Sequence, residues 1–104
     1  MKRGEIHWYK FQAPDKKRPV LILHRDEIIP YLSEITIAPL TTTVRDIPSE
    51  VFLSKGSDGV QEDCVVNLDH IQTVSKSKIG SHITTLNQFK MRAVSNAIQF
   101  ALRI

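Results

Sequence analysis

The chain has 104 residues, the usual length of one domain, so we expect a single domain over residues 1–104. Hydrophobic residues make up 41% of the chain and charged residues 24%, an ordinary balance for a globular protein; no apolar run approaches the roughly 20 residues that a membrane-spanning helix needs. The net charge of +3 is compatible with an anionic partner such as nucleic acid, but it is too small to demonstrate one.

The cysteine count and the N-terminus both bear on location. Cys64 is the only cysteine, so no disulfide can form within the chain, which fits a reducing compartment. Residues 1–5 are polar and lack the apolar core of a secretion signal. We therefore expect a cytoplasmic protein that is not associated with a membrane. Cys64 itself lies in an apolar stretch, where an inert buried thiol is the expected state.

The first half of the chain predicts three strands. Apolar and β-branched residues predict them over residues 5–11, 18–23 and 34–40. The second strand begins with Arg18-Pro19; because proline lacks an N–H, it belongs at the first residue of a strand or on an edge. Residues 12–17 are rich in turn formers, and residues 25–29 predict a short helix limited by Pro30.

The second half predicts further short strands and one helix. Strands are expected over residues 50–53, 63–68, 71–74 and 83–86, with exposed loops over 44–48 and 54–62. The helix begins after Asn87, a strong N-cap, and Leu86 can pack on Met91 as a hydrophobic staple. Four apolar residues then share one helix face: Val94, Ile98, Ala101 and Leu102. The pattern predicts a mainly β fold, a small β-barrel with a C-terminal α-helix packed on it.

The strand over residues 18–23 begins at a cluster of cations. Lys16, Lys17 and Arg18 are consecutive, and the strand over residues 34–40 ends in three threonines that start at Thr41. If the two strands pair antiparallel, the start of one lies near the end of the other, and Arg18 lies close to Thr41. A cation beside hydroxyls suits a phosphate group. The alternative is a solvated basic loop beside an unrelated threonine-rich turn.

Four motifs, in this order and spacing, resemble the MazF/PemK family of bacterial toxins. They are Arg3-Gly4-Glu5-Ile6, Arg18-Pro19-Val20-Leu21-Ile22-Leu23, Ile37-Ala38-Pro39-Leu40-Thr41 and Asp63-Cys64-Val65-Val66-Asn67-Leu68-Asp69-His70-Ile71-Gln72-Thr73. The resemblance implies the toxin of a type II toxin–antitoxin system: a metal-independent, sequence-selective endoribonuclease on an SH3-like barrel that acts as a homodimer. The catalytic pair of the family, carried over by position, falls on Arg18 and Thr41.

The resemblance also implies products, partners and a target class. The RNA is cleaved by its own 2′-OH, which leaves a 2′,3′-cyclic phosphate and a 5′-OH, and no metal or cofactor takes part. The partners are the RNA substrate and a cognate acidic antitoxin whose disordered tail covers Arg18. The loop before Arg18 is shorter than in many members, and Gln72 replaces a usual arginine, so the RNA preference is open between mRNA, tRNA and rRNA.

Roles can be assigned to side chains near these motifs. Arg18 would stabilise charge on the phosphoryl oxygens, and Thr41 would hold a non-bridging oxygen. Proton transfer or base recognition has three candidates: His70, Asp69 and His7. His24 is a weaker candidate because it lies at the opposite end of the Arg18 strand. The candidates for other contacts to the RNA are Lys16, Lys17, Arg45 and Asn67.

Two other functions remain open at this point. Gyrase poisons of the CcdB type share the barrel, but they depend on a tryptophan near the end of the C-terminal helix, whereas Trp8 is the only tryptophan here. The second alternative is a non-catalytic interaction module on the same barrel.

Overall fold

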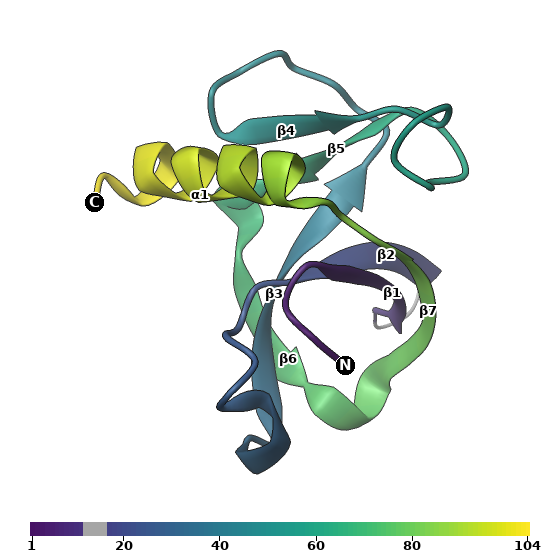
Figure 1. The fold of residues 1–104 in the computed structure, drawn as a ribbon, viewed down its shortest axis with the longest axis vertical. Coiled ribbons are helices and arrows are strands. Elements are labelled where there is room, and N and C mark those ends of the chain that lie inside the picture. Colours follow the sequence, from purple (N-terminus) through teal and green to yellow (C-terminus); the bar gives the residue numbers. More distant parts are fainter. Residues whose placement is uncertain (12–16) are drawn as a thin grey trace.

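The computed structural model describes residues 1–11 and 17–104. In this part of the chain it contains seven strands and one α-helix (Figure 1). The elements are β1 (Glu5–Lys10), β2 (Lys17–Ile22), β3 (Glu34–Thr41), β4 (Glu50–Leu53), β5 (Cys64–Asn67), β6 (Gln72–Ser75), β7 (Ile79–Thr85) and α1 (Gln88–Leu102). Three short 3-10 helices join them: η1 (Ile29–Tyr31), η2 (Leu68–His70) and η3 (Lys76–Lys78). No described helix is long and apolar enough to cross a membrane.

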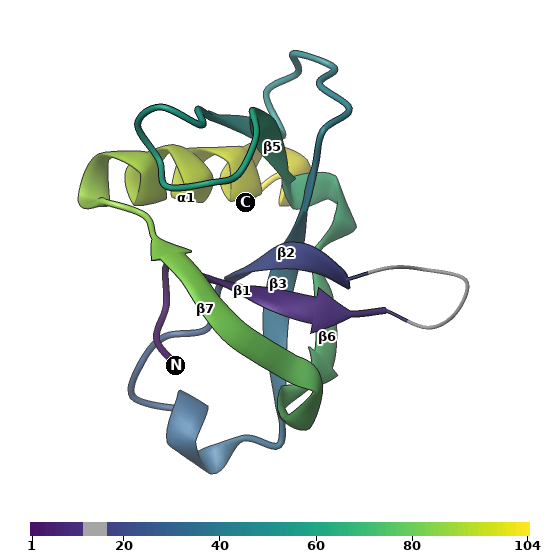
Figure 2. The ribbon, with the colours of Figure 1, turned by 90° about the vertical axis from the view of Figure 1, so that its right-hand side faces the viewer.

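The strands form one antiparallel sheet with the order β4-β5-β3-β2-β1-β7. β3 joins its parts, because it pairs with β2 and β6 along its length and with β5 at its end. The sheet curls into a barrel-like shape whose described strands stay open between β4 and β7, and α1 lies beside β4 and β5 at one end (Figures 1 and 2). The prediction of a mainly β fold with a C-terminal helix is confirmed.

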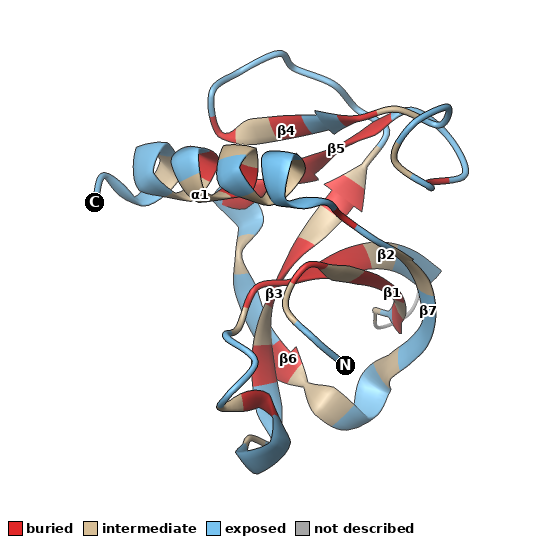
Figure 3. Ribbon diagram, in the orientation of Figure 1, coloured by how far each residue is buried: buried red, intermediate tan, exposed pale blue. Residues whose placement is uncertain are grey.

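From Val20 to Ile22, β2 is buried on both faces, which explains the apolar run in this part of the strand. Leu21 belongs to the core between the sheet and α1, whereas Val20 and Ile22 belong to a second core with Ile35 and Ile37. Alternate side chains of a strand point to opposite faces, so one strand serves both cores. Figure 3 shows many of the buried residues in β2, β3 and β5, whereas Lys17 and Arg18 at the start of β2 are exposed and Thr41 at the end of β3 is half-buried.

Three predictions of local structure need correction. Residues 26–28 form a turn in place of the predicted helix, and η1 begins only at Ile29, with Pro30 in its first turn, where a missing N–H is tolerated. β7 begins at Ile79 rather than residue 83, because its polar first half pairs with β1. The predicted strand 63–68 ends at Asn67, and the side chain of Asn67 caps the N-terminus of η2.

The helix begins as predicted but its apolar face differs at the end. The Asn87 side chain accepts a hydrogen bond of 2.8 Å from the N–H of Lys90, which caps α1. Val94 and Ala97 are buried, whereas Leu102, at the end of the predicted apolar face, is 54% exposed. The last turn of α1 projects beyond β4 in Figure 1, and no described strand covers it there.

Candidate functional site

The pairing of β2 with β3 brings the two predicted catalytic residues together. Val20 pairs with Pro39, and Leu21 pairs with Ala38. Continuing this antiparallel register by two residues places Arg18 opposite Thr41. Both residues line a cavity of about 400 Å³, which we call the Arg18 cavity. The sequence-based expectation that they are neighbours is therefore met by the geometry of the sheet.

The lining of the Arg18 cavity has three chemically distinct parts. A cationic and hydroxyl-bearing edge comes from the ends of β2 and β3: Lys17, Arg18, Thr41, Thr42 and Thr43. An apolar part comprises Trp8, Pro19, Leu40, Val60 and Ile83. A polar part comes from the end of the loop over residues 54–62: Gln61 and Glu62, with Cys64 beyond them.

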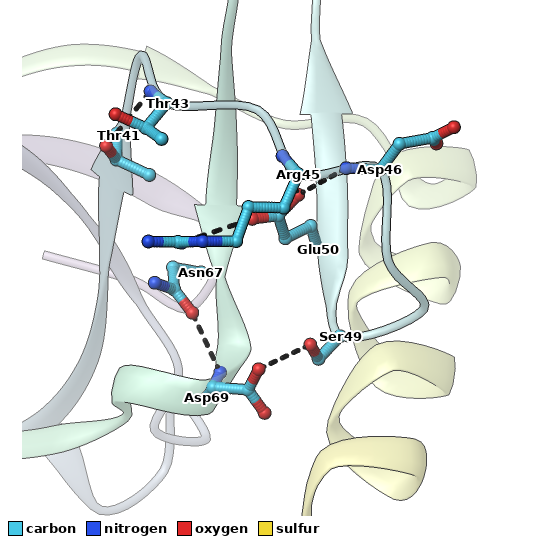
Figure 4. A network of polar contacts seen from close by, with 8 residues as sticks. All are labelled: Thr41, Thr43, Arg45, Asp46, Ser49, Glu50, Asn67 and Asp69. Carbon is cyan, nitrogen blue, oxygen red and sulfur yellow. Dashed lines mark hydrogen bonds and ion pairs between the residues drawn. The ribbon is translucent and has the colours of Figure 1, made fainter.

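Thr41 has its hydroxyl partly engaged. Its Oγ1 accepts a hydrogen bond of 3.2 Å from the backbone N–H of Thr43 (Figure 4). A hydroxyl that accepts still has its own proton to donate. Thr41 is therefore held in place by the turn that follows β3 while its O–H can bind an anionic oxygen.

Arg18 also reaches a second cavity. It lines a space of about 210 Å³ with Phe11, Pro39, His70 and Gln72. His70, a predicted proton-transfer candidate, is therefore brought beside Arg18. The guanidinium of Arg18 is exposed and makes no hydrogen bond or ion pair with any other described residue. Its donors are available for a ligand.

Asp69 and Asn67 shape the turn that carries His70. The Asn67 amide oxygen accepts the N–H of Asp69 at 3.0 Å, and the Asp69 carboxylate accepts the hydroxyl of Ser49 at 2.6 Å (Figure 4). Asn67 is buried. Neither Asn67 nor Asp69 lines the Arg18 cavity or the smaller cavity beside it. The geometry thus assigns both side chains a structural role in η2, and does not place them at the substrate side as the sequence analysis had expected.

His7 is not part of either cavity. It is buried in β1, with Nδ1 2.9 Å from the carbonyl oxygen of Gly80 and Nε2 2.7 Å from a carboxylate oxygen of Glu5. Both ring nitrogens are therefore engaged within the fold, by a backbone carbonyl and by a carboxylate. Burial raises the pKa of Glu5, but hydrogen bonds from His7 and from the backbone outweigh it, and the pKa lies below its ordinary 4.5. His24 binds the N–H of Thr36 instead, away from the site.

The predicted cations are distributed unequally. Lys17 lines the Arg18 cavity, whereas Lys16 lies outside the described residues. Arg45 is exposed on the loop after β3, with its guanidinium 3.8 Å from the Glu50 carboxylate; Figure 4 shows the side chain extending toward the end of β3 that carries Thr41. That loop is held by Glu50, which accepts the backbone N–H of Arg45 at 3.0 Å. Arg45 is therefore beside the cavity edge without lining the cavity.

Cys64 is inert, as expected from its sequence context. Burial and the carboxylates of Glu62, Asp63 and Asp58 raise the pKa of its thiol to about 11. The thiol is protonated at neutral pH and is a poor nucleophile.

Several residues that line the Arg18 cavity were missed by sequence reasoning. Trp8, Gln61 and Glu62 reach the Arg18 cavity from β1 and from a loop far away in the chain. The sequence of this loop is polar, and nothing in it indicates that the loop lies beside Arg18. Only the fold shows that this loop returns to the start of β2.

Comparisons with known proteins agree on one family. The family described as PemK-like, MazF-like toxin of type II toxin–antitoxin system matches residues 2–102. The probable endoribonuclease MazF5 of Mycobacterium tuberculosis is 39% identical over 100 residues, which cover 96% of this chain and 91% of that protein. The endoribonuclease MazF of Staphylococcus saprophyticus is 31% identical, with 98% of this chain and 91% of that protein covered.

Solved structures agree with the sequence relatives. The Mycobacterium tuberculosis toxin MazF-mt6 has a TM-score of 0.87 and 36% identity, with 96% of this chain and 97% of that chain covered. An endoribonuclease in complex with its cognate antitoxin, from a mycobacterial species, has a TM-score of 0.88 and 25% identity, with 100% and 96% covered.

Proposed function

The chain belongs to the PemK-like, MazF-like family of toxins of type II toxin–antitoxin systems, and from this we propose that it cleaves RNA at Arg18 and Thr41. The observation that carries the assignment is the facing position of these two residues at one end of the β2–β3 pair, where both line the same cavity. RNA contains its own nucleophile, the 2′-OH. The protein must orient that hydroxyl in line with the phosphorus and stabilise the charge that develops on the phosphoryl oxygens.

Arg18 and Thr41 supply the charge stabilisation. The planar guanidinium of Arg18 can make two charge-assisted hydrogen bonds to one phosphate, and its donors have no competing partner among the described residues. A guanidinium remains protonated, so Arg18 donates to the substrate and does not accept the proton of the 2′-OH. The Thr41 hydroxyl donates to a non-bridging oxygen, and Lys17 adds positive charge at the same edge.

His70 is our candidate for accepting the proton of the 2′-OH. It shares the smaller cavity with Arg18, and an imidazole can accept a proton near neutral pH. Asn67 and Asp69 hold η2, and so they position His70 rather than touching the substrate. The products are a 2′,3′-cyclic phosphate and a 5′-OH, and this chemistry requires no metal ion. Lys17 and Arg45 contact flanking phosphates, which set position rather than sequence.

The partners follow from the same surface. The antitoxin places an acidic, disordered tail over the cationic edge, where it competes with RNA for Arg18. The structural relative with its cognate antitoxin supports such a pairing. The toxin acts in the cytoplasm, where its RNA substrates are found.

The chain acts as a homodimer. An apolar groove of about 420 Å³ lies between β4 and α1, and the exposed side chains of Phe52, Phe89 and Phe100 line it. Apolar area of this kind is stabilised when a second surface covers it.

The test is cleavage of total bacterial RNA in excess EDTA, followed by mapping of the new ends. We expect discrete cuts with 5′-OH ends for the wild type, and their loss in Arg18→Ala and Thr41→Ala. Arg25→Ala is the matched control, because Arg25 is an exposed arginine outside both cavities. No cleavage by the folded wild type would leave a non-catalytic interaction module. Cleavage that survives both substitutions would refute the assignment of the site.

A further inference from the structure

The Arg18 cavity contains a carboxylate that binding of phosphate does not explain. Glu62 lines the same cavity as Lys17 and Arg18. A carboxylate repels RNA phosphates and can only accept hydrogen bonds when it is ionised. Its natural partner in a bound RNA is therefore a donor group on a base, and not the backbone.

The loop that presents Glu62 is anchored at two points. Gly59 has a φ of +78° and packs so closely on Thr84 of β7 that an added Cβ would lie 2.9 Å from the Cβ of that residue. Asp58 lies 3.6 Å from the ammonium of Lys90 in the first turn of α1. Figure 2 shows the loop over the start of α1, near the end of β7. A side chain on an anchored backbone can select a ligand, because little ordering is needed when the ligand binds.

The charge of this loop reaches the cavity lining. Cys64 lines the cavity, and after burial the carboxylates of Glu62, Asp63 and Asp58 raise its pKa. The cavity thus has a cationic edge and, at the loop, the carboxylate of Glu62. Such polarity suits a nucleotide, in which the phosphate is anionic and the base carries hydrogen-bond donors.

The apolar part of the cavity suits a base. Trp8 is half-buried and lines the cavity together with Pro19, Val60 and Ile83. A volume of about 400 Å³ accommodates a nucleobase. Unpaired bases bind to proteins by stacking on aromatic side chains while their Watson–Crick edges form hydrogen bonds.

We propose that the Arg18 cavity holds the unpaired base next to the scissile phosphate, and that Glu62 selects a base with an exocyclic amino group. The inference rests on the proposed RNA cleavage. Guanine offers two adjacent donors, N1–H and the N2 amino group, and cytosine and adenine offer one amino group each. Uracil places carbonyl oxygens on both sides of its single N–H, and these are repelled by the carboxylate. Gln61 can donate to the carbonyl oxygen of a guanine or a cytosine.

The test uses synthetic RNAs that contain the mapped cleavage sequence, with each of the four bases placed immediately 5′ and 3′ of the cut. We compare kcat/KM for the wild type, Glu62→Gln and the control Glu27→Gln, which removes an exposed carboxylate outside the cavity. At one of the two positions the wild type should disfavour uracil by about 5- to 150-fold, the range for one base-specific contact. Glu62→Gln should reduce that ratio to a few-fold, whereas Glu27→Gln should leave it unchanged.

Binding is measured separately on the same RNAs. A 2′-deoxy substitution at the cut nucleotide removes the nucleophile, so the affinities can be compared without cleavage; they should follow the same order of bases. Unchanged base ratios in Glu62→Gln would overturn the inference while the endoribonuclease assignment stands. A uniform gain for all four bases would also overturn it, because it would show that Glu62 only repels phosphate. A wild type that cuts no RNA would refute the proposed function itself.

Discussion

In the loop beside the site, Gly59 is the position at which adding one methyl group should lower the free energy of unfolding most. Its φ of +78° lies in the left-handed region, which costs an L-residue other than glycine roughly 1–2 kcal/mol. In Gly59→Ala the new Cβ would also overlap Thr84 Oγ1 and lie 2.9 Å from Thr84 Cβ. Overpacking of this kind costs about 1–3 kcal/mol. The two effects together predict a loss of about 2–5 kcal/mol in the free energy of unfolding.

The assay is urea unfolding at one protein concentration, because a dimer makes apparent stability depend on concentration. For a domain of this size the loss corresponds to a fall in melting temperature of roughly 10 °C or more. Gly56→Ala is the matched control: the nearest atom to its new Cβ would be Ser54 Oγ at 3.6 Å, and the change in the free energy of unfolding should stay within about 1 kcal/mol. The double variant Gly59→Ala/Thr84→Ala should recover only part of the loss, since the Thr84 Cβ position and the φ strain remain. A Gly59→Ala protein as stable as the wild type would refute the close packing of the loop on β7.

Three further predictions concern the helix cap, an ion pair and the thiol. Asn87→Ala should lower the free energy of unfolding by about 1 kcal/mol, whereas Asn96→Ala, at an exposed position inside α1, should not lower it. The pKa of the Glu5 carboxyl is lower in the folded chain, so the stabilisation from Glu5 is present above about pH 4.5 and is lost as the pH falls through the lowered pKa. Glu5→Gln should remove this part of the pH dependence of the urea midpoint. Burial and nearby carboxylates raise the pKa of Cys64 to about 11, so the folded chain should resist alkylation by iodoacetamide at pH 8, whereas the chain unfolded in urea should react rapidly. Fast reaction of the folded protein would contradict the burial of the thiol.

The catalytic pair could be predicted from the sequence because its position depends on the register of two strands. β2 begins with the cations Lys17 and Arg18 and is apolar from Pro19 to Ile22. β3 ends at Thr41. Antiparallel pairing of two such segments leaves little freedom in register, since a slip of one residue exchanges the faces of a strand. Local patterning was therefore enough for the central part of the sheet.

The rest of the site depends on contacts between distant segments. His7 looks like a free histidine in the sequence, but its ring is held between Glu5 and the backbone of Gly80, seventy-three residues away. The approach of Glu62 to Arg18 likewise depends on the anchoring of its loop at β7 and α1. Residues 79–82 were not predicted as strand from the sequence, yet they are part of β7, which pairs with β1. Short-range sequence patterns carry no information about such pairings.

The separation between the strand pair and the loop has an evolutionary consequence. Arg18 and Thr41 are placed by backbone hydrogen bonding within the sheet, whereas Gln61 and Glu62 are placed by a loop attached at Gly59. Substitutions in the last residues of that loop leave the ladder between β2 and β3 intact. During evolution, a substitution at Gln61 or Glu62 can therefore change the base that we propose is selected without displacing Arg18 and Thr41, which we propose carry out the cleavage.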